Sequence, residues 1–92
     1  MNTESNCNHL LLQLTSGNLL YYSIENNSLY FSEIIDTRIA NKEKILDNID
    51  IFTGTLDKDE RIHLVYITKE GKLFYRLIDN GYVNDIFLKK FI

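Results

Sequence analysis

The chain has 92 residues, a net charge of −3 and a single cysteine, Cys7, so it forms one small domain at most and no internal disulfide. Its Lys and Arg residues are scattered, which argues against a nucleic-acid-binding surface, and no apolar run reaches the about 18–20 residues that a membrane helix needs. A lone thiol and the lack of a signal-peptide pattern predict a cytoplasmic protein that contacts no membrane.

Residues 1–8 are mostly polar, and we expect a flexible N-terminal tail there. The remainder, 9–92, is expected to be a single β domain made of two repeats, 9–48 and 49–92. When the sequence is aligned with itself so that His9 falls on His63, seven positions are identical between 9–35 and 63–89 without a gap. An internal repeat of this kind indicates that one structural unit occurs twice.

Each copy of the repeat contains apolar runs separated by turn residues. Gly17 and Gly71 stand between the first two runs, where a tight hairpin needs one residue at positive φ. The runs predict strands at 9–15, 18–25 and 29–35, and again at 61–68, 71–78 and 82–91, with a further strand at 49–54.

The segment from Asp36 to Asn48 is ambiguous. Asp36 could cap a short helix in which Ile39, Ala40, Glu43 and Leu46 fall at roughly helical spacing. The same residues could instead extend a strand and lead through a loop to Ile49. The sequence leaves both interpretations open.

Several runs, such as Leu10-Leu11-Leu12 and Leu64-Val65-Tyr66-Ile67, are apolar on both faces of a strand. A sheet covered by neighbours on both sides shows such a pattern. We therefore predict an all-β fold of antiparallel meander sheets with three to four strands each. With only two sheets, Leu10, Leu12, Tyr66 and Phe74 are expected to contribute to uncovered apolar patches.

The stretch from Ile62 to Asn80 resembles a bacterial β-propeller repeat with the consensus xIHLVYxxxxGKLFYRxxxN. The resemblance covers most of 49–90 and extends more weakly over 9–35, and the tryptophan usual in that family is missing. It implies two propeller-like blades in a bacterial protein. The implied function is a non-enzymatic interaction module that forms homo-oligomers or joins neighbouring blades of a longer chain. The alternative is a small carbohydrate-binding lectin assembled from two-blade chains.

Six residues are candidates for ligand or partner contact. His9 and His63 recur at the same position, but no second His, Cys or carboxylate recurs near either one. This favours a structural role at the start of a strand, or a hydrogen bond between blades, over a zinc site. Tyr21 and Tyr75 also recur, followed by Tyr22 and Arg76, and such aromatic side chains could stack on a sugar or a partner.

No catalytic constellation is apparent. The acidic loop with Asp57, Asp59 and Glu60 lacks the glycine and distal glutamate of an EF-hand, and a solvated hairpin loop is the better interpretation. Glycine-rich phosphate loops and nucleophile–base pairs are also missing. We expect no enzymatic activity, no metal site and no cofactor.

Overall fold

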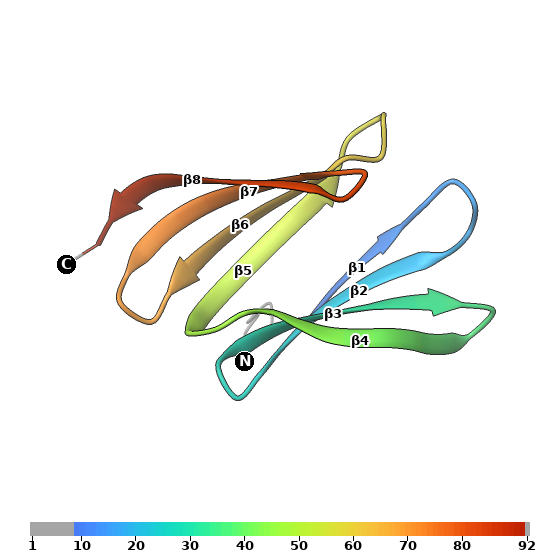
Figure 1. Ribbon diagram of the computed structural model, residues 1–92, viewed down its shortest axis with the longest axis horizontal. Helices are drawn as coiled ribbons and strands as arrows, with labels where there is room; N and C mark the ends of the chain where they lie inside the picture. Colours follow the sequence, from blue (N-terminus) through green and yellow to red (C-terminus); the bar gives the residue numbers. More distant parts are fainter. Residues whose placement is uncertain (1–8, 92) are drawn as a thin grey trace, which may run out of the picture.

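The computed structural model describes residues 9–91, so the predicted tail at 1–8 lies outside the described residues. The described chain is all-β and forms two antiparallel meander sheets of four strands each (Figure 1). This confirms the predicted fold class and is consistent with two blades. The first sheet contains β1 (His9–Gln13), β2 (Leu19–Glu25), β3 (Ser28–Ile35) and β4 (Arg38–Leu46). The second contains β5 (Ile49–Leu56), β6 (Ile62–Thr68), β7 (Lys72–Asp79) and β8 (Tyr82–Lys90).

Tight turns join most of the strands. Gly17 and Gly71 have φ values of 97° and 81°, as the glycine positions predicted. Three other hairpins turn through two residues that both have positive φ, which is the type I′ geometry that matches the twist of the flanking strands. These pairs are Asn26-Asn27, Asp36-Thr37 and Asn80-Gly81.

The ambiguous segment forms strand β4, so the helical interpretation was wrong and the strand interpretation is confirmed. The turn at Asp36-Thr37 reverses the chain and sets Ile39 opposite Ile34 of β3. The apolar residues that suggested helical spacing are spread by irregularities in the β3–β4 ladder, and Asn41 has a φ of 54°. Strand pairing with β3 therefore outweighs the local helical pattern.

The sequence repeat and the two sheets are offset from each other by one strand. The alignment of His9 with His63 places β1, β2 and β3 on β6, β7 and β8, whereas β1 is the first strand of its sheet and β6 is the second of its own. The equivalent residues Tyr22 and Arg76 line the same cleft between the sheets. The two copies of the repeat thus face each other through equivalent surfaces.

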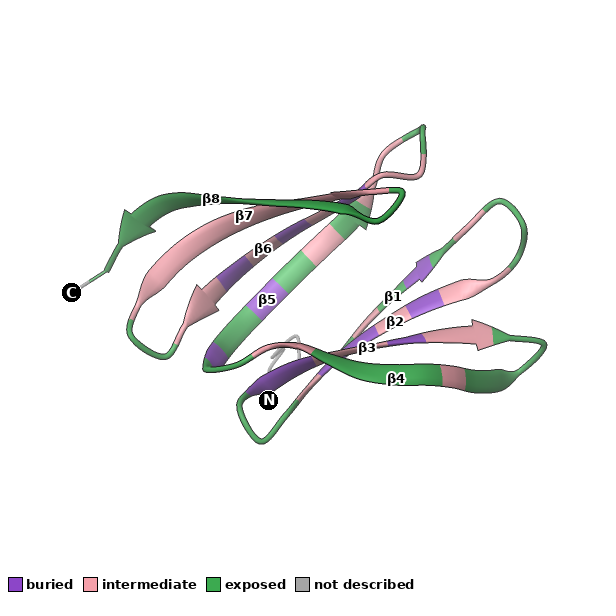
Figure 2. Ribbon diagram, in the orientation of Figure 1, coloured by how far each residue is buried: buried purple, intermediate pink, exposed green. Residues whose placement is uncertain are grey.

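The core lies between the sheets (Figure 2). The rings of Tyr22 and Phe52, one from each sheet, have centroids 6.4 Å apart. Leu12 and Tyr66 are buried in this core, and Leu10 and Phe74 pack against it. The prediction that these four residues form uncovered patches was therefore wrong, because the inner faces of the two sheets cover each other.

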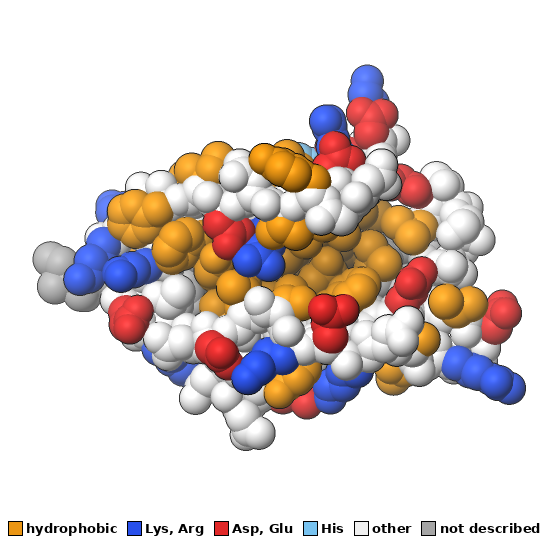
Figure 3. Space-filling view, viewed as in Figure 1, with side chains coloured by type: hydrophobic (Ala, Val, Ile, Leu, Met, Phe, Trp, Pro, Cys, Tyr) orange, Lys and Arg blue, Asp and Glu red, His pale blue; other side chains and the backbone are white. Residues whose placement is uncertain are grey.

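The two sheets approach along β1 and β5 and diverge toward β4 and β8 (Figure 1). The divergence leaves a cleft of about 280 Å³, and Figure 3 shows apolar side chains lining the hollow between the sheets. Gly54 lies where β5 meets β1, since a Cβ atom there would be 3.2 Å from Leu10 Cδ2. No helix among the described residues is long and apolar enough to cross a membrane.

Candidate binding surface on the second sheet

The outer face of the second sheet, turned away from the first sheet, is formed by three cross-strand rows. The first row is Ile51, Ile67, Leu73 and Lys89; the second is Thr53, Val65, Tyr75 and Ile86; the third is Thr55, His63, Leu77 and Asn84. Ile51 and Ile86 are exposed by 42% and 45%, and the apolar residues of β6 and β7 are half-buried. The rows thus form an apolar surface with Lys89 at the end of the first row and polar side chains along the third row.

The same face of the first sheet is more polar. Where the second copy of the repeat has Ile67, Leu77 and Ile86, the first copy has Gln13 and the buried serines Ser23 and Ser32. Because the two copies form the same hairpins with the same residues facing outward, the apolar side chains of the second sheet are not demanded by its strand geometry. Their half-exposed apolar area distinguishes this face from the outer face of the first sheet.

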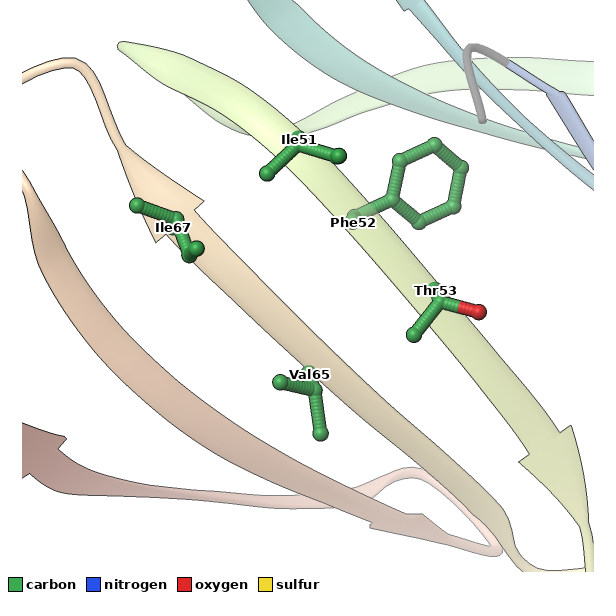
Figure 4. A pocket seen from close by; sticks show the side chains of 5 residues that line it. All are labelled: Ile51, Phe52, Thr53, Val65 and Ile67. Atoms are coloured by element: carbon green, nitrogen blue, oxygen red, sulfur yellow. The ribbon is translucent and has the colours of Figure 1, made fainter. Parts of the chain in front are cut away.

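A shallow groove of about 200 Å³ crosses this face over β5 and β6. Figure 4 shows Ile51 and Thr53 on β5 beside Ile67 and Val65 on β6, while the ring of Phe52 extends into the core. Three of the four outward side chains are β-branched hydrocarbons with few rotamers. A groove of this kind suits an apolar side chain of a partner.

Three polar side chains form a hydrogen-bonded chain at the margin of the apolar rows. His63 Nδ1 lies 2.6 Å from the Tyr75 hydroxyl, and His63 Nε2 lies 2.9 Å from Asp57 Oδ2. Because a carboxylate only accepts, Nε2–H donates to Asp57, and in the neutral imidazole Nδ1 then accepts from the Tyr75 hydroxyl. Asp57 thereby fixes the tautomer of His63, which in turn orients Tyr75.

Asp57 organises the loop between β5 and β6. Its Oδ1 accepts the backbone N–H groups of Asp59 and Arg61, and its Oδ2 accepts from Arg61 Nε at 2.7 Å. The hydrogen bond from His63 and those from Arg61 hold the pKa of Asp57 far below its ordinary range. The carboxylate therefore stays ionised, and the loop is tied to the binding face.

The contact of Asp57 with His63 was not predicted, because only residues that recur in both copies were considered. Asp57 precedes His63 by six residues and reaches it because the β5–β6 loop folds back on itself. Sequence comparison of the two copies could not find it, since the position equivalent to Asp57 is Thr3. The apolar contrast at Ile67, Leu77 and Ile86 was also missed, although aligning the two copies by outward-facing residue would have revealed it.

The histidine–tyrosine pairing itself recurs in the first sheet. His9 Nδ1 lies 2.6 Å from the Tyr21 hydroxyl, with the two rings stacked at 7°. Both pairs join diagonal neighbours on adjacent strands of one sheet, so these hydrogen bonds do not run between the blades as one of the two interpretations predicted. Only the pair of His63 and Tyr75 lies on the apolar outer face.

The remaining candidates, Tyr22 and Arg76, lie on the inner faces. Burial raises the pKa of Tyr22 to about 12, and Arg76 pairs with Asp85 on β8. The structure therefore separates the six candidate residues into two His–Tyr pairs on the outer faces and one facing pair in the cleft. Among residues 9–91, no three His, Cys, Asp or Glu side chains are placed to hold one metal ion.

The outer face combines an apolar centre with oriented polar groups at the margin, a composition that resembles that of protein interfaces. Comparison of the chain with protein-family models, with curated proteins and with solved structures found no match.

Proposed function

We propose that the protein is a non-enzymatic interaction module, similar in design to propeller blades, that self-associates by covering the outer face of its second sheet with a second copy. The observation that carries this proposal is the contrast between the two copies of the repeat. Ile67 and Leu77 are apolar where the first copy has Gln13 and Ser23 at equivalent outward positions. In a monomer both side chains remain only half-buried.

The physical reason for association is the hydrophobic effect. Apolar area removed from water stabilises a complex by about 25 cal/mol per Å², before the loss of rotational and translational freedom is subtracted. The hydrogen-bonded chain of Asp57, His63 and Tyr75 leaves few unpaired polar groups at the margin, so covering the face requires little loss of hydration there.

Light scattering at micromolar concentration tests the proposal. We expect a mass above the 10.8 kDa of one chain. The double variant Ile67→Gln/Leu77→Ser installs the side chains of the first copy and should shift the protein toward monomer while its circular dichroism stays unchanged. Leu11→Ser, an exposed change on the outer face of the first sheet, is the matched control and should leave the mass unchanged.

Two results would refute the proposal. One is a parent protein that is monomeric and binds no hydrophobic dye, and the other is a double variant that associates as the parent does. A glycan array separates the lectin alternative: saturable sugar binding that is lost in Tyr75→Phe, with no self-association, would favour it over the interaction module.

A further inference from the structure

The outermost strand of the second sheet, β8, differs from the other three edge strands. All nine of its residues are exposed, among them Tyr82, Val83, Ile86, Phe87 and Leu88 (Figure 2). An edge strand carries unpaired backbone N–H and C=O groups, and proteins normally protect it with charges, bulges or a covering element. The four edges can therefore be compared for such protection.

Three of the edges are protected. The edges of β1 and β5 lie beside each other, and β1 has only five residues. Strand β4 carries the charged residues Arg38, Lys42, Glu43 and Lys44, its ladder with β3 is interrupted twice, and Asn41 has positive φ. Neither a second chain nor another sheet pairs readily with strands of this kind.

Strand β8 lacks these features over most of its length. From Tyr82 to Leu88 its one charged residue is Asp85, which Arg76 neutralises through two hydrogen bonds. Its ladder with β7 has a single irregularity, near the end that carries Lys89 and Lys90. The stretch 82–88 is therefore a long, apolar and unprotected edge.

The repeat indicates which kind of strand would pair with the free edge of β8. Strand β8 is the equivalent of β3, since Ser28–Ile35 of the first copy aligns with 82–89 of the second. The outer edge of β3 pairs with an antiparallel strand, β4, whereas no strand among the described residues pairs with the outer edge of β8. The second sheet thus lacks the strand that its own repeat unit carries in the first sheet.

We propose that β8 pairs antiparallel with β8 of a second copy across a two-fold axis, which joins the two second sheets into one continuous sheet. Two arguments select this occupant. A pairing partner needs a free, unprotected edge of its own, and within this chain β8 is the described strand that meets this condition. In-register parallel pairing would also set Lys89 and Lys90 beside the same residues of the second copy, whereas antiparallel pairing separates these like charges.

The inference rests on the proposed function only in requiring a second copy, and it uses a different surface. In the dimer, the second sheet of each copy forms half of one continuous sheet. The two-fold axis is perpendicular to this sheet, so the outer faces of both halves lie on the same side and form one larger face. Self-association through β8 would therefore extend the apolar outer face rather than cover it.

A cysteine scan tests the geometry. In a Cys7→Ser background, single cysteines are placed at positions 84, 85, 86, 87 and 88, and the oxidised full chain is examined for disulfide-linked dimers. Antiparallel self-pairing brings a residue next to its own counterpart only near the two-fold axis; two residues from the axis, counterparts are about 14 Å apart. A disulfide requires Cα atoms within about 7 Å. We expect cross-linking at one or two adjacent positions.

The controls are Ile39→Cys on the protected edge of β4, which should not cross-link, and Ile67→Cys on the outer face. Absence of cross-linking on β8, or equal cross-linking along it, would overturn the inference. Cross-linking at position 67 alone would overturn it and leave the proposed function intact. A third outcome combines the two experiments: cysteines on β8 cross-link, and Ile67→Gln/Leu77→Ser has the same mass in solution as the parent. This outcome would support the inference and refute the proposed function.

A second measurement does not depend on cysteine chemistry. Ile86→Lys places two like charges close together near the proposed axis and should raise the dimer Kd about tenfold. Ile39→Lys makes the same change on β4 and should leave the Kd within about twofold. Equal effects of the two variants would contradict pairing through β8.

Discussion

Arg76 and Asp85 stand opposite each other on β7 and β8, and the guanidinium binds both oxygens of the carboxylate. Arg76 Nε lies 2.6 Å from Oδ1 and Nη2 lies 2.8 Å from Oδ2. Only 13% of the arginine side chain is exposed, and the Tyr66 hydroxyl donates to the same carboxylate at 3.2 Å. The pair is thus a shielded ion pair at the wall of the cleft between the sheets.

We expect strong coupling within this pair. Asp85→Ala leaves Arg76 shielded and without its partner, which should lower the free energy of unfolding by about 1–3 kcal/mol. Arg76→Met/Asp85→Ala removes both charges and should lose less than the sum of the single variants. Urea denaturation of the four proteins measures the coupling, and additive losses would show that the two side chains act independently.

Asp57 should make stability depend on acidity. Its folded pKa is depressed below the ordinary value of 3.8, so its stabilising contribution is present above that pH and is lost as the pH falls through the lower range. We expect Asp57→Asn to have a lower Tm than the parent at pH 7 and the difference to shrink below pH 3.8. A Tm difference that stays constant from pH 7 to pH 2 would contradict this role.

Gly54 should tolerate no side chain. A Cβ atom at this position would lie 2.5 Å from Leu64 Cδ2 and 2.7 Å from the His63 carbonyl oxygen, closer than any normal contact. We expect Gly54→Ala to lower the free energy of unfolding by about 1–3 kcal/mol, because β5 must move from β6 and β1. Chemical denaturation measures this, and Thr55→Ala, at the exposed neighbour, should change stability by less than about 0.5 kcal/mol.

Thr37 is held in a conformation that suits it poorly. Its φ is 67°, and a β-branched residue is strained in the left-handed region. Thr37→Gly creates the Asp-Gly sequence preferred in type I′ turns and should raise the free energy of unfolding by about 1 kcal/mol. Thermal denaturation tests this, with Asn27→Gly as the control, since asparagine already tolerates this region; an equal gain in both variants would mean that strain at Thr37 is not the cause.

Much of the fold was predictable because the turn residues can be recognised in the sequence. Gly17, Gly71 and the pairs at Asn26 and Asn80 divide the apolar runs into strands whose bounds agree with the structure within about two residues. The sequence could not decide between helix and strand at β4, because alternating charges at Lys42, Glu43 and Lys44 carry no strand signal and pairing with β3 decides the conformation.

The binding surface was harder to predict than the fold. Runs that are apolar on both faces do not reveal which face packs against the other sheet, so Leu12 and Tyr66 were assigned to the wrong environment. The pairing of each histidine with a tyrosine twelve residues later was implicit in the repeat. The contact of Asp57 with His63 depends on a loop conformation that no periodicity encodes.

The meander topology also has a consequence for how the chain folds. Every β-ladder of the two sheets joins strands that are neighbours in the sequence, so each strand can pair as soon as the adjacent strand has formed. Folding rates of small domains rise as the sequence separation of contacting residues falls. The chain should therefore fold quickly for an all-β protein, with each sheet forming from local hairpins and the docking of β1 against β5 following as the late, long-range step.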